Sequence, residues 1–233
     1  MQDILNNITN KYKALQFNEE LHQYKVGNEK FTSVSKKIEK YVHYVDYDEL
    51  AGKVAKFRGV SKQSIVDEWE ETKVEACDRG TRVHLFGENY VWDRTLIPSC
   101  KQEEAVVKFW NDLPSHIVPA FIELRMYHPS LTFAGTSDIL LFNQKTKMFI
   151  IADYKTNKDL FKNWKGKTLL PPFQSLLECP LNKYQIQLSF YQLLFELTGY
   201  KVESRKIIWL LKTGEYIMYD GEDLTSILKQ HLN

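Results

Sequence analysis

The chain contains few cysteines, and none of them are arranged as a cross-linking or metal-binding framework. Its three cysteines, Cys77, Cys100 and Cys179, are odd in number, widely spaced and without a CxxC pair. This argues against both a disulfide framework and a zinc ribbon. The cysteine content is therefore typical of a reducing, intracellular compartment.

The chain also lacks an excess of charge of either sign. A formal net charge of +1 over 233 residues provides no overall attraction to a polyanion, so a nucleic-acid site would have to come from local clusters of Lys and Arg. Hydrophobic residues make up 43% and charged residues 26%, the balance of a soluble folded protein.

Targeting segments and nucleotide motifs are missing as well. No apolar run approaches the roughly 20 residues that span a bilayer, and the first 15 residues lack the apolar segment of a secretory signal. We therefore expect a cytoplasmic protein without a membrane partner, or a nuclear one in a eukaryotic host. Gly166-Lys167-Thr168 lacks the upstream glycine of a phosphate-binding loop, so no use of ATP is expected.

The chain shows no internal repeat and no linker, which predicts one domain over 1–233, with an N-terminal hairpin and helical elaboration over 1–60 and a core over 61–233. Residues 14–34 predict two short strands around a Gly27-Asn28 turn, followed by a helix capped by Ser33 or Ser35. Further helices are expected over 47–58, 61–93 and 102–113.

From residue 120 onward the apolar period changes to that of strands. Strands are expected over 121–128, 136–142, 148–155, 206–212 and 215–220, and helices over 182–199 and 221–232. The sequence therefore predicts an α/β fold, in which a mixed central sheet is flanked by helices and the N-terminal half is mainly helical.

Two aspartates lie on neighbouring predicted strands. If the turn between these strands is centred near Lys145, Asp138 faces residue 152 or 153. Carboxylates about 5 Å apart repel one another unless a cation lies between them, and Lys155 follows Asp153 on the same face. This array suits a hard divalent cation and phosphodiester hydrolysis. As isolated residues, however, an Asp-Tyr-Lys strand end and an aspartate turn cap are the commoner interpretation.

Four short motifs occur in a fixed order along the chain. They are Gly80-Thr-Arg-Val-His84, Gly135-Thr-Ser-Asp138, Asp153-Tyr-Lys155 and Gln187-Leu-Ser-Phe-Tyr191. In this order the chain resembles the RecB-type exonucleases of the PD-(D/E)XK nuclease superfamily, over residues 77–192. The resemblance implies a restriction-endonuclease-like core and a metal-dependent DNA nuclease, of which an exonuclease is the first choice. An endonuclease of the same fold and an inactive module that only binds nucleic acid are the alternatives.

The resemblance also implies roles for individual residues. His84, Asp138, Asp153 and the backbone carbonyl of Tyr154 would bind Mg2+ or Mn2+, and Lys155 would be the catalytic lysine. An imidazole ligand makes Mn2+ at least as suitable as Mg2+. Some relatives carry an iron-sulfur cluster held by four cysteines, which the three cysteines of this chain cannot supply.

Four further polar side chains are candidates around that centre. Gln187 and Tyr191 project from one helix face toward the implied active site, although ordinary amphipathic patterning explains the pair equally well. Glu88, one turn after His84, would hold the imidazole or a metal-bound water, and Glu123 is a further acid. For both glutamates a surface carboxylate is the commoner explanation.

DNA contacts are predicted from local clusters. Arg79 and Arg82 flank the His84 motif, and a basic segment with one tryptophan follows the catalytic strand, comprising Lys158, Lys162, Trp164 and Lys165. Such a mixture suits a backbone-tracking groove for single-stranded DNA or DNA with free ends. A solvated lysine-rich loop is an equal alternative. Tyr41, Tyr44 and Tyr47 either line a strand-entry channel or belong to the core. A replication or recombination protein would be a further partner.

Overall fold

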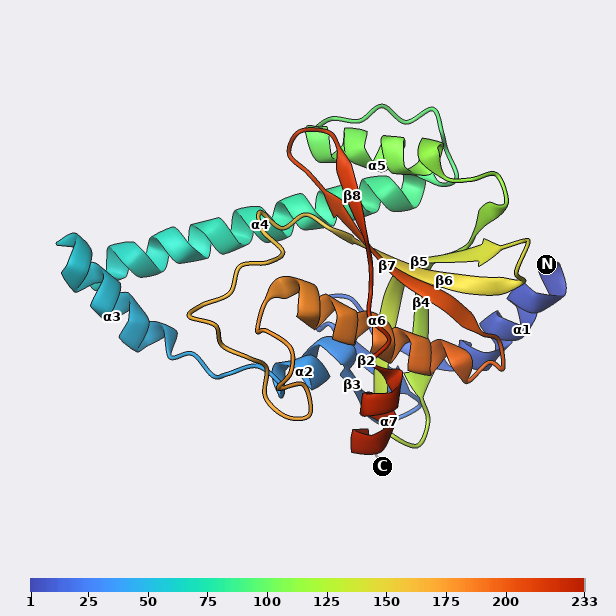
Figure 1. The fold of residues 1–233 in the computed structure, drawn as a ribbon, viewed down its shortest axis with the longest axis horizontal. Helices are drawn as coiled ribbons and strands as arrows, with labels where there is room; N and C mark the ends of the chain where they lie inside the picture. Colours follow the sequence, from blue (N-terminus) through green and yellow to red (C-terminus); the bar gives the residue numbers. More distant parts are fainter. Residues whose placement is uncertain (233) are drawn as a thin grey trace.

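The fold is built on one mixed β-sheet flanked by helices, as a computed structural model of residues 1–232 describes it (Figure 1). The strand order is β1-β2-β3-β5-β6-β7-β8, and β4 pairs with β5 outside this path. The β3–β5 and β6–β7 pairs are parallel, and the remaining pairs are antiparallel. The strands are β1 (Leu15–Asn18), β2 (Gln23–Val26), β3 (Glu29–Ser33), β4 (Ile117–His128), β5 (Phe133–Asn143), β6 (Met148–Lys155), β7 (Val202–Leu210) and β8 (Tyr216–Asp220).

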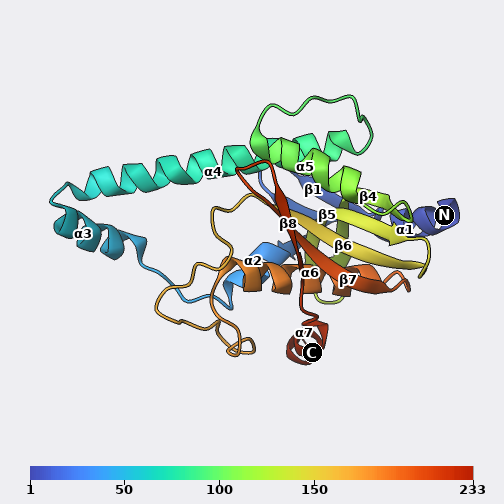
Figure 2. The same cartoon turned by 45° about the horizontal axis from the view of Figure 1, so that its top comes forward.

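Helices cover both faces of the sheet. The helices are α1 (Gln2–Tyr12), α2 (Val34–Glu39), α3 (Tyr47–Arg58), α4 (Lys62–Tyr90), α5 (Lys101–Asp112), α6 (Pro180–Glu196) and α7 (Thr225–Leu232). One face packs against α6 together with α1, α2 and α7, and the other packs against α5 and the C-terminal half of α4 (Figure 2). Within residues 1–232, no helix is long and apolar enough to cross a membrane.

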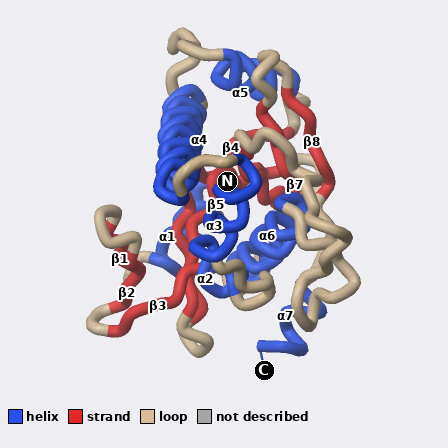
Figure 3. Tube along the Cα trace, turned by 90° about the vertical axis from the view of Figure 1, so that its left-hand side faces the viewer, coloured by secondary structure: helices blue, strands red, loops and turns tan. Residues whose placement is uncertain are grey.

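The partners of β5 change along its length. One edge of β5 pairs with β4 from Phe133 to Asn143. The other edge pairs with β3 at Phe133 and Ala134, and with β6 from Ile139 onward. Residues 135–138 therefore lie where the two partners diverge. Strand β5 itself lies between the β1–β3 end and the β7–β8 end of the sheet (Figure 3). Backbone at such a split is open to side chains from neighbouring helices.

A helical arm projects from the sheet. It consists of α3 and the N-terminal half of α4, which lie side by side (Figures 1 and 2). Asp46 and Ser61 cap the two helices by accepting hydrogen bonds from backbone N–H groups. Gly59 ends α3 in the left-handed conformation that glycine adopts without strain. Ala51, Ala55 and Ile65 form the buried cluster between the helices.

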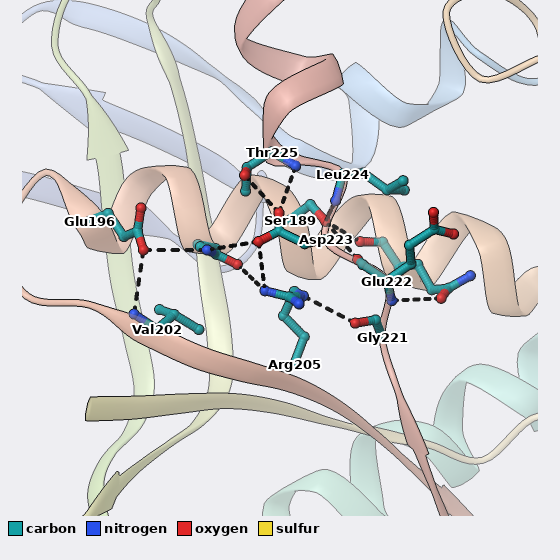
Figure 4. A network of polar contacts seen from close by, with 11 residues as sticks. Ser189, Glu196, Val202, Arg205, Gly221, Glu222, Asp223, Leu224 and Thr225 are labelled. Atoms are coloured by element: carbon teal, nitrogen blue, oxygen red, sulfur yellow. Dashed lines mark hydrogen bonds and ion pairs between the residues drawn. The ribbon is translucent and has the colours of Figure 1, made fainter. Parts of the chain in front are cut away.

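A buried polar network fixes α6 against the sheet (Figure 4). Arg205 of β7 donates hydrogen bonds to Gln192 of α6, and to the carboxylate of Asp223 at 3.2 Å. Its Nε also donates to the carbonyl of Gly221 at 3.2 Å, and Ser189 of α6 accepts from the backbone N–H of Leu224 at 3.1 Å. These contacts fix the position of the helix that carries the Gln187 and Tyr191 side chains.

The predicted secondary structure is largely confirmed, including the bounds of α3 and β6 and the Ser33 cap of α2. Two elements were not predicted: helix α1, and strand β1, which makes residues 14–34 a set of three strands rather than two. The helix expected over 61–93 is buried mainly in the C-terminal half of α4, at Val83, Gly87 and Tyr90, because the N-terminal half lies in the arm, away from the sheet.

Candidate functional site

Asp138 and Asp153 lie side by side at the split in the sheet. Ile139 pairs with Ala152, and continuing this register places Asp138 opposite Asp153, as the turn position predicts. Asp138 Oδ2 accepts a hydrogen bond from the backbone N–H of Tyr154 at 3.2 Å. The same oxygen lies 3.1 Å from His84 Nδ1. Helix α4 and strands β5 and β6 therefore meet at Asp138. His84, Asp138, Asp153 and Lys155 together are called the acidic centre below.

The Asp153 side chain is buried beside Lys155. Asp153 is 1% exposed, and it forms an ion pair with Lys155. Apart from that ion pair, its Oδ2 atom has no hydrogen-bond partner among the described residues. Burial, and next the charge of Asp138, raise the pKa of Asp153 to about 6. Burial lowers the pKa of Lys155, but the two aspartates outweigh it and raise that pKa above its usual value. A buried carboxylate beside a second acidic group, with one ammonium as its partner, is a position that a divalent cation would stabilise.

His84 and Asp138 form a charged pair in the absence of a metal. Burial lowers the pKa of His84, but the adjacent Asp138 carboxylate raises it to about 9. Burial raises the pKa of Asp138, while His84 and Lys155 bring it below its usual value. Within residues 1–232, no three His, Cys, Asp or Glu side chains already surround one point. Metal binding would therefore replace the contact between His84 and Asp138.

Two glutamates lie close to Asp138. Glu123 lies between two residues of β4 that pair with Ile139 and Ser137, and so approaches Asp138 from the other edge of β5. Its backbone φ is +54°, which is unusual for a residue other than glycine. Burial, then Asp138 and Glu88, raise the pKa of Glu123 to about 8. Burial and Asp138 also raise the pKa of Glu88. Both predicted glutamates therefore lie at the centre and not on the outer surface.

Gln187 and Tyr191 also reach this centre. Gln187 Nε2 donates a hydrogen bond to the Tyr191 hydroxyl at 2.8 Å. The Tyr191 ring covers Gly135, where a Cβ atom would lie 2.6 Å from Tyr191 Cε1. Only glycine fits at this position without movement of the ring, which gives the first residue of the GxxD motif a packing role. At Gly87, a Cβ atom would likewise lie 2.6 Å from the Tyr154 ring, a packing role that was not predicted.

The arginines predicted to contact DNA are arranged differently from the expectation. The guanidinium of Arg82 lies 3.6 Å from the buried Glu103 carboxylate, so its charge is already partly balanced. Arg79 Nε is buried and has no hydrogen-bond partner in the described part of the chain. Neither arginine lines the cavities around His84 and Asp138.

The predicted basic segment lies in the loop between β6 and α6. Lys158, Lys162 and Trp164 line a cavity of about 430 Å³ that shares Glu178 and Lys183 with the cavity around Lys155, and Lys165 lies over the Trp164 ring at 5.8 Å. The three tyrosines predicted to line a channel or to belong to the core lie in different surroundings. Tyr41 is buried in the core, whereas Tyr44 and Tyr47 are exposed.

Two larger cavities open on either side of the centre. One, of about 790 Å³, is lined by His84, Asp138, the β1–β2 hairpin and Arg125. The other, of about 1120 Å³, is lined by Lys155, Tyr44 and Tyr184. Ser35 and Gln187 line both cavities. The contribution of the hairpin was not predicted, because it depends on the non-local pairing of β3 with β5.

Comparisons with known proteins leave the family unassigned: no family model matches the chain, and no curated protein matches it.

Proposed function

We propose that this protein is a metal-dependent deoxyribonuclease of the RecB type, with a restriction-endonuclease-like core, that cuts single-stranded DNA or DNA with free ends. The observation that carries the proposal is the buried Asp153 carboxylate. This carboxylate lies beside Asp138, and its partner among the described residues is the Lys155 ammonium. A buried acidic pair is costly unless a cation and an ammonium neutralise it.

The residues at the centre fit a divalent cation. His84, Asp138 and Asp153 offer one nitrogen and four carboxylate oxygens, and the Tyr154 carbonyl is a further oxygen donor. When bound, Mg2+ or Mn2+ would lower the pKa of a water molecule and neutralise charge on the phosphate oxygens. Glu88 and Glu123, close to Asp138, would accept hydrogen bonds from water around the cation.

Lys155 acts on the reacting phosphate. The Asp153 carboxylate and the Tyr184 ring, whose centre lies 4.3 Å from Nζ, hold its ammonium in place. An ammonium that is already oriented stabilises the negative charge that develops in the transition state, since it need not reorganise during the reaction. The raised pKa keeps Lys155 positively charged at neutral pH.

Exonuclease action is the first interpretation, because the four motifs together resemble the RecB-type exonucleases. An endonuclease with the same centre is the second candidate, and it is favoured by the two cavities, which adjoin each other at Ser35 and Gln187. The third candidate is an inactive module that only binds nucleic acid. Such a module would not need the combination of His84, Asp138, Asp153 and Lys155.

The test uses end-labelled linear DNA, single-stranded and duplex, and a closed single-stranded circle, each with Mg2+, Mn2+ or EDTA. We expect cleavage with either cation and none with EDTA. Asp153→Asn should abolish cleavage and leave most DNA binding intact. Asp220→Asn is the matched control, since Asp220 also pairs with a lysine, Lys206, but on the exposed surface.

Cleavage of linear DNA alone would select the exonuclease, and cutting of the circle would select the endonuclease. DNA binding without cleavage by the wild-type protein under any of these conditions would contradict the proposal in favour of the inactive module.

A further inference from the structure

The cavity beneath the β1–β2 hairpin has the chemistry of a nucleotide-binding site. Arg125 of β4 lies over the Phe17 ring at 5.0 Å, and Phe17 in turn packs on Tyr24 at 4.5 Å. Flat aromatic rings and a planar guanidinium bind nucleobases by stacking, and the guanidinium also binds phosphate. Both groups line the same cavity as His84 and Asp138.

The charge of Arg125 is available for an anionic ligand. Its only ion pair within the described residues is with Glu19, at 3.4 Å, and the two side chains are 42% and 81% exposed to solvent. Exposed pairs of this kind contribute little free energy, so a phosphate group can replace Glu19 at little cost. The Tyr24 hydroxyl, in contrast, is bonded to Thr136 at 2.8 Å, which fixes the aromatic wall.

The second cavity offers a stacking surface on the other side of the centre. Tyr44 is 89% exposed and lines this cavity with Lys155 and Lys183. Four acidic side chains line the same cavity, and three of them, all except Glu39, are engaged within the protein. Asp46 caps α3, Asp48 pairs with Lys62, and Glu178 accepts a hydrogen bond from the backbone of His43.

The two cavities share Ser35 and Gln187 and open to solvent. Their volumes, about 790 Å³ and 1120 Å³, each exceed what a drug-sized ligand of a few hundred Å³ requires. There is thus room for at least one nucleotide on each side of the phosphate that would lie between Asp138 and Lys155. A site that released single nucleotides would instead close within one nucleotide of the cut bond.

We infer that the hairpin cavity, with Arg125 and Phe17, is a nucleotide-binding subsite opposite a second subsite at Tyr44, so that a single strand is held on both sides of the scissile phosphate. The inference rests on the proposed function for the identity of the centre. It predicts products of two or more nucleotides.

Binding is measured first, independently of cleavage. Fluorescence anisotropy with labelled oligothymidylates of increasing length, in Ca2+, should show affinity that rises until both cavities are filled. Arg125→Ala and Tyr44→Ala should each weaken binding of the longer oligonucleotides about 5-fold or more, the loss typical of one stacking contact. Phe57→Ala is the matched control. Phe57 is an aromatic residue that is 91% exposed, and it lies on the arm outside both cavities.

Product lengths are then measured on sequencing gels with Mn2+. We expect dinucleotides or longer and no mononucleotides. If Arg125→Ala binds the longer oligonucleotides like the wild type, or if mononucleotides dominate, the two-subsite inference is overturned. Binding that depends on Arg125 and Tyr44 without any cleavage would support the subsites and contradict the proposed nuclease function instead.

Discussion

The sheet and the helical arm differ in how they are held together. Around the sheet, the buried clusters contain many large side chains, among them Phe109, Phe133, Phe149, Phe190 and Phe195. The arm has three buried residues, of which two are alanines. Its ion pairs, such as Lys53–Glu49 and Arg58–Glu68, are exposed and contribute at most about 1 kcal/mol each.

This difference separates the part that carries the candidate site from the part that can open. His84, Asp138, Asp153 and Lys155 all belong to elements of the sheet or to the half of α4 packed on it. Fewer buried contacts mean a lower free energy of local opening. The arm should therefore open without disturbing the acidic centre.

The largest effect is expected in the core of the sheet. Phe149 is fully buried, and its ring packs on Phe142 and Phe195 at 5.0 and 4.8 Å. Phe149→Ala should lower the free energy of unfolding by about 3–5 kcal/mol. Urea unfolding followed by circular dichroism measures this loss. A change below about 1 kcal/mol would mean that the sheet is held together elsewhere.

In the arm, Ile65 is the largest buried side chain. Ile65→Ala should cost roughly 2 kcal/mol, the lower end for such a change, because the exposed helices can close around the space. Hydrogen exchange should show faster opening of α3, while the amides of β5 and β6 stay protected as in the wild type. Equal loss of protection in both regions would remove the distinction between sheet and arm.

Two glycines of the motifs give a matched pair. Gly135→Ala places a Cβ atom 2.6 Å from Tyr191 and 3.0 Å from Val34, and such overpacking costs about 1–3 kcal/mol. At Gly80, in α4, the nearest atom lies at 3.7 Å, and alanine should stabilise the helix by roughly 0.5–1 kcal/mol. Thermal melts should therefore move in opposite directions, and a shift in the same direction would show that the Tyr191 contact is unimportant.

The smallest effect is a dependence of stability on pH without metal. Burial and then Asp138 raise the pKa of Glu123 from 4.5 to about 8, so in the intermediate range the folded protein holds a proton that the unfolded chain has released. The resulting contribution of Glu123 to the free energy of unfolding is fully present below its pKa in the unfolded chain. It is lost as the pH rises through about 8, its pKa in the folded protein. Asp153, raised from 3.8 to about 6, acts in the same direction at lower pH.

The melting temperature of the metal-free protein should therefore fall between pH 4.5 and about pH 8, the range that the raised pKa of Glu123 covers. His84, whose pKa is raised from 6.5 to about 9, adds to the fall at higher pH. Glu123→Gln should reduce this fall, whereas Asp220→Asn, at an exposed ion pair, should leave it unchanged. An identical fall in the Glu123→Gln protein would assign the pH dependence to other groups.

Local pattern was sufficient to predict the pairing of Asp138 with Asp153. The polar turn fixes the register of β5 and β6, and the register fixes which residues face each other. No local rule of this kind places His84 beside Asp138. Only the order of the four motifs indicated that the two side chains would meet. The positive φ of Glu123, the pairing of Arg82 with Glu103 and the projection of the arm depend on tertiary packing. Helix α1 was missed because only Ile8 and Tyr12 of its residues are buried.

The most direct test compares Lys155→Ala with Lys206→Ala, since each lysine pairs with an aspartate but only Lys155 is at the centre. Single-turnover cleavage of a labelled single strand is measured with saturating protein and Mn2+. Lys155→Ala should lower the rate by about 100- to 1000-fold, the typical loss of one group that stabilises a transition state, with binding retained. Lys206→Ala should cleave at the wild-type rate. Wild-type cleavage by the Lys155→Ala protein would contradict the assignment of the Asp153-Tyr-Lys155 segment to catalysis.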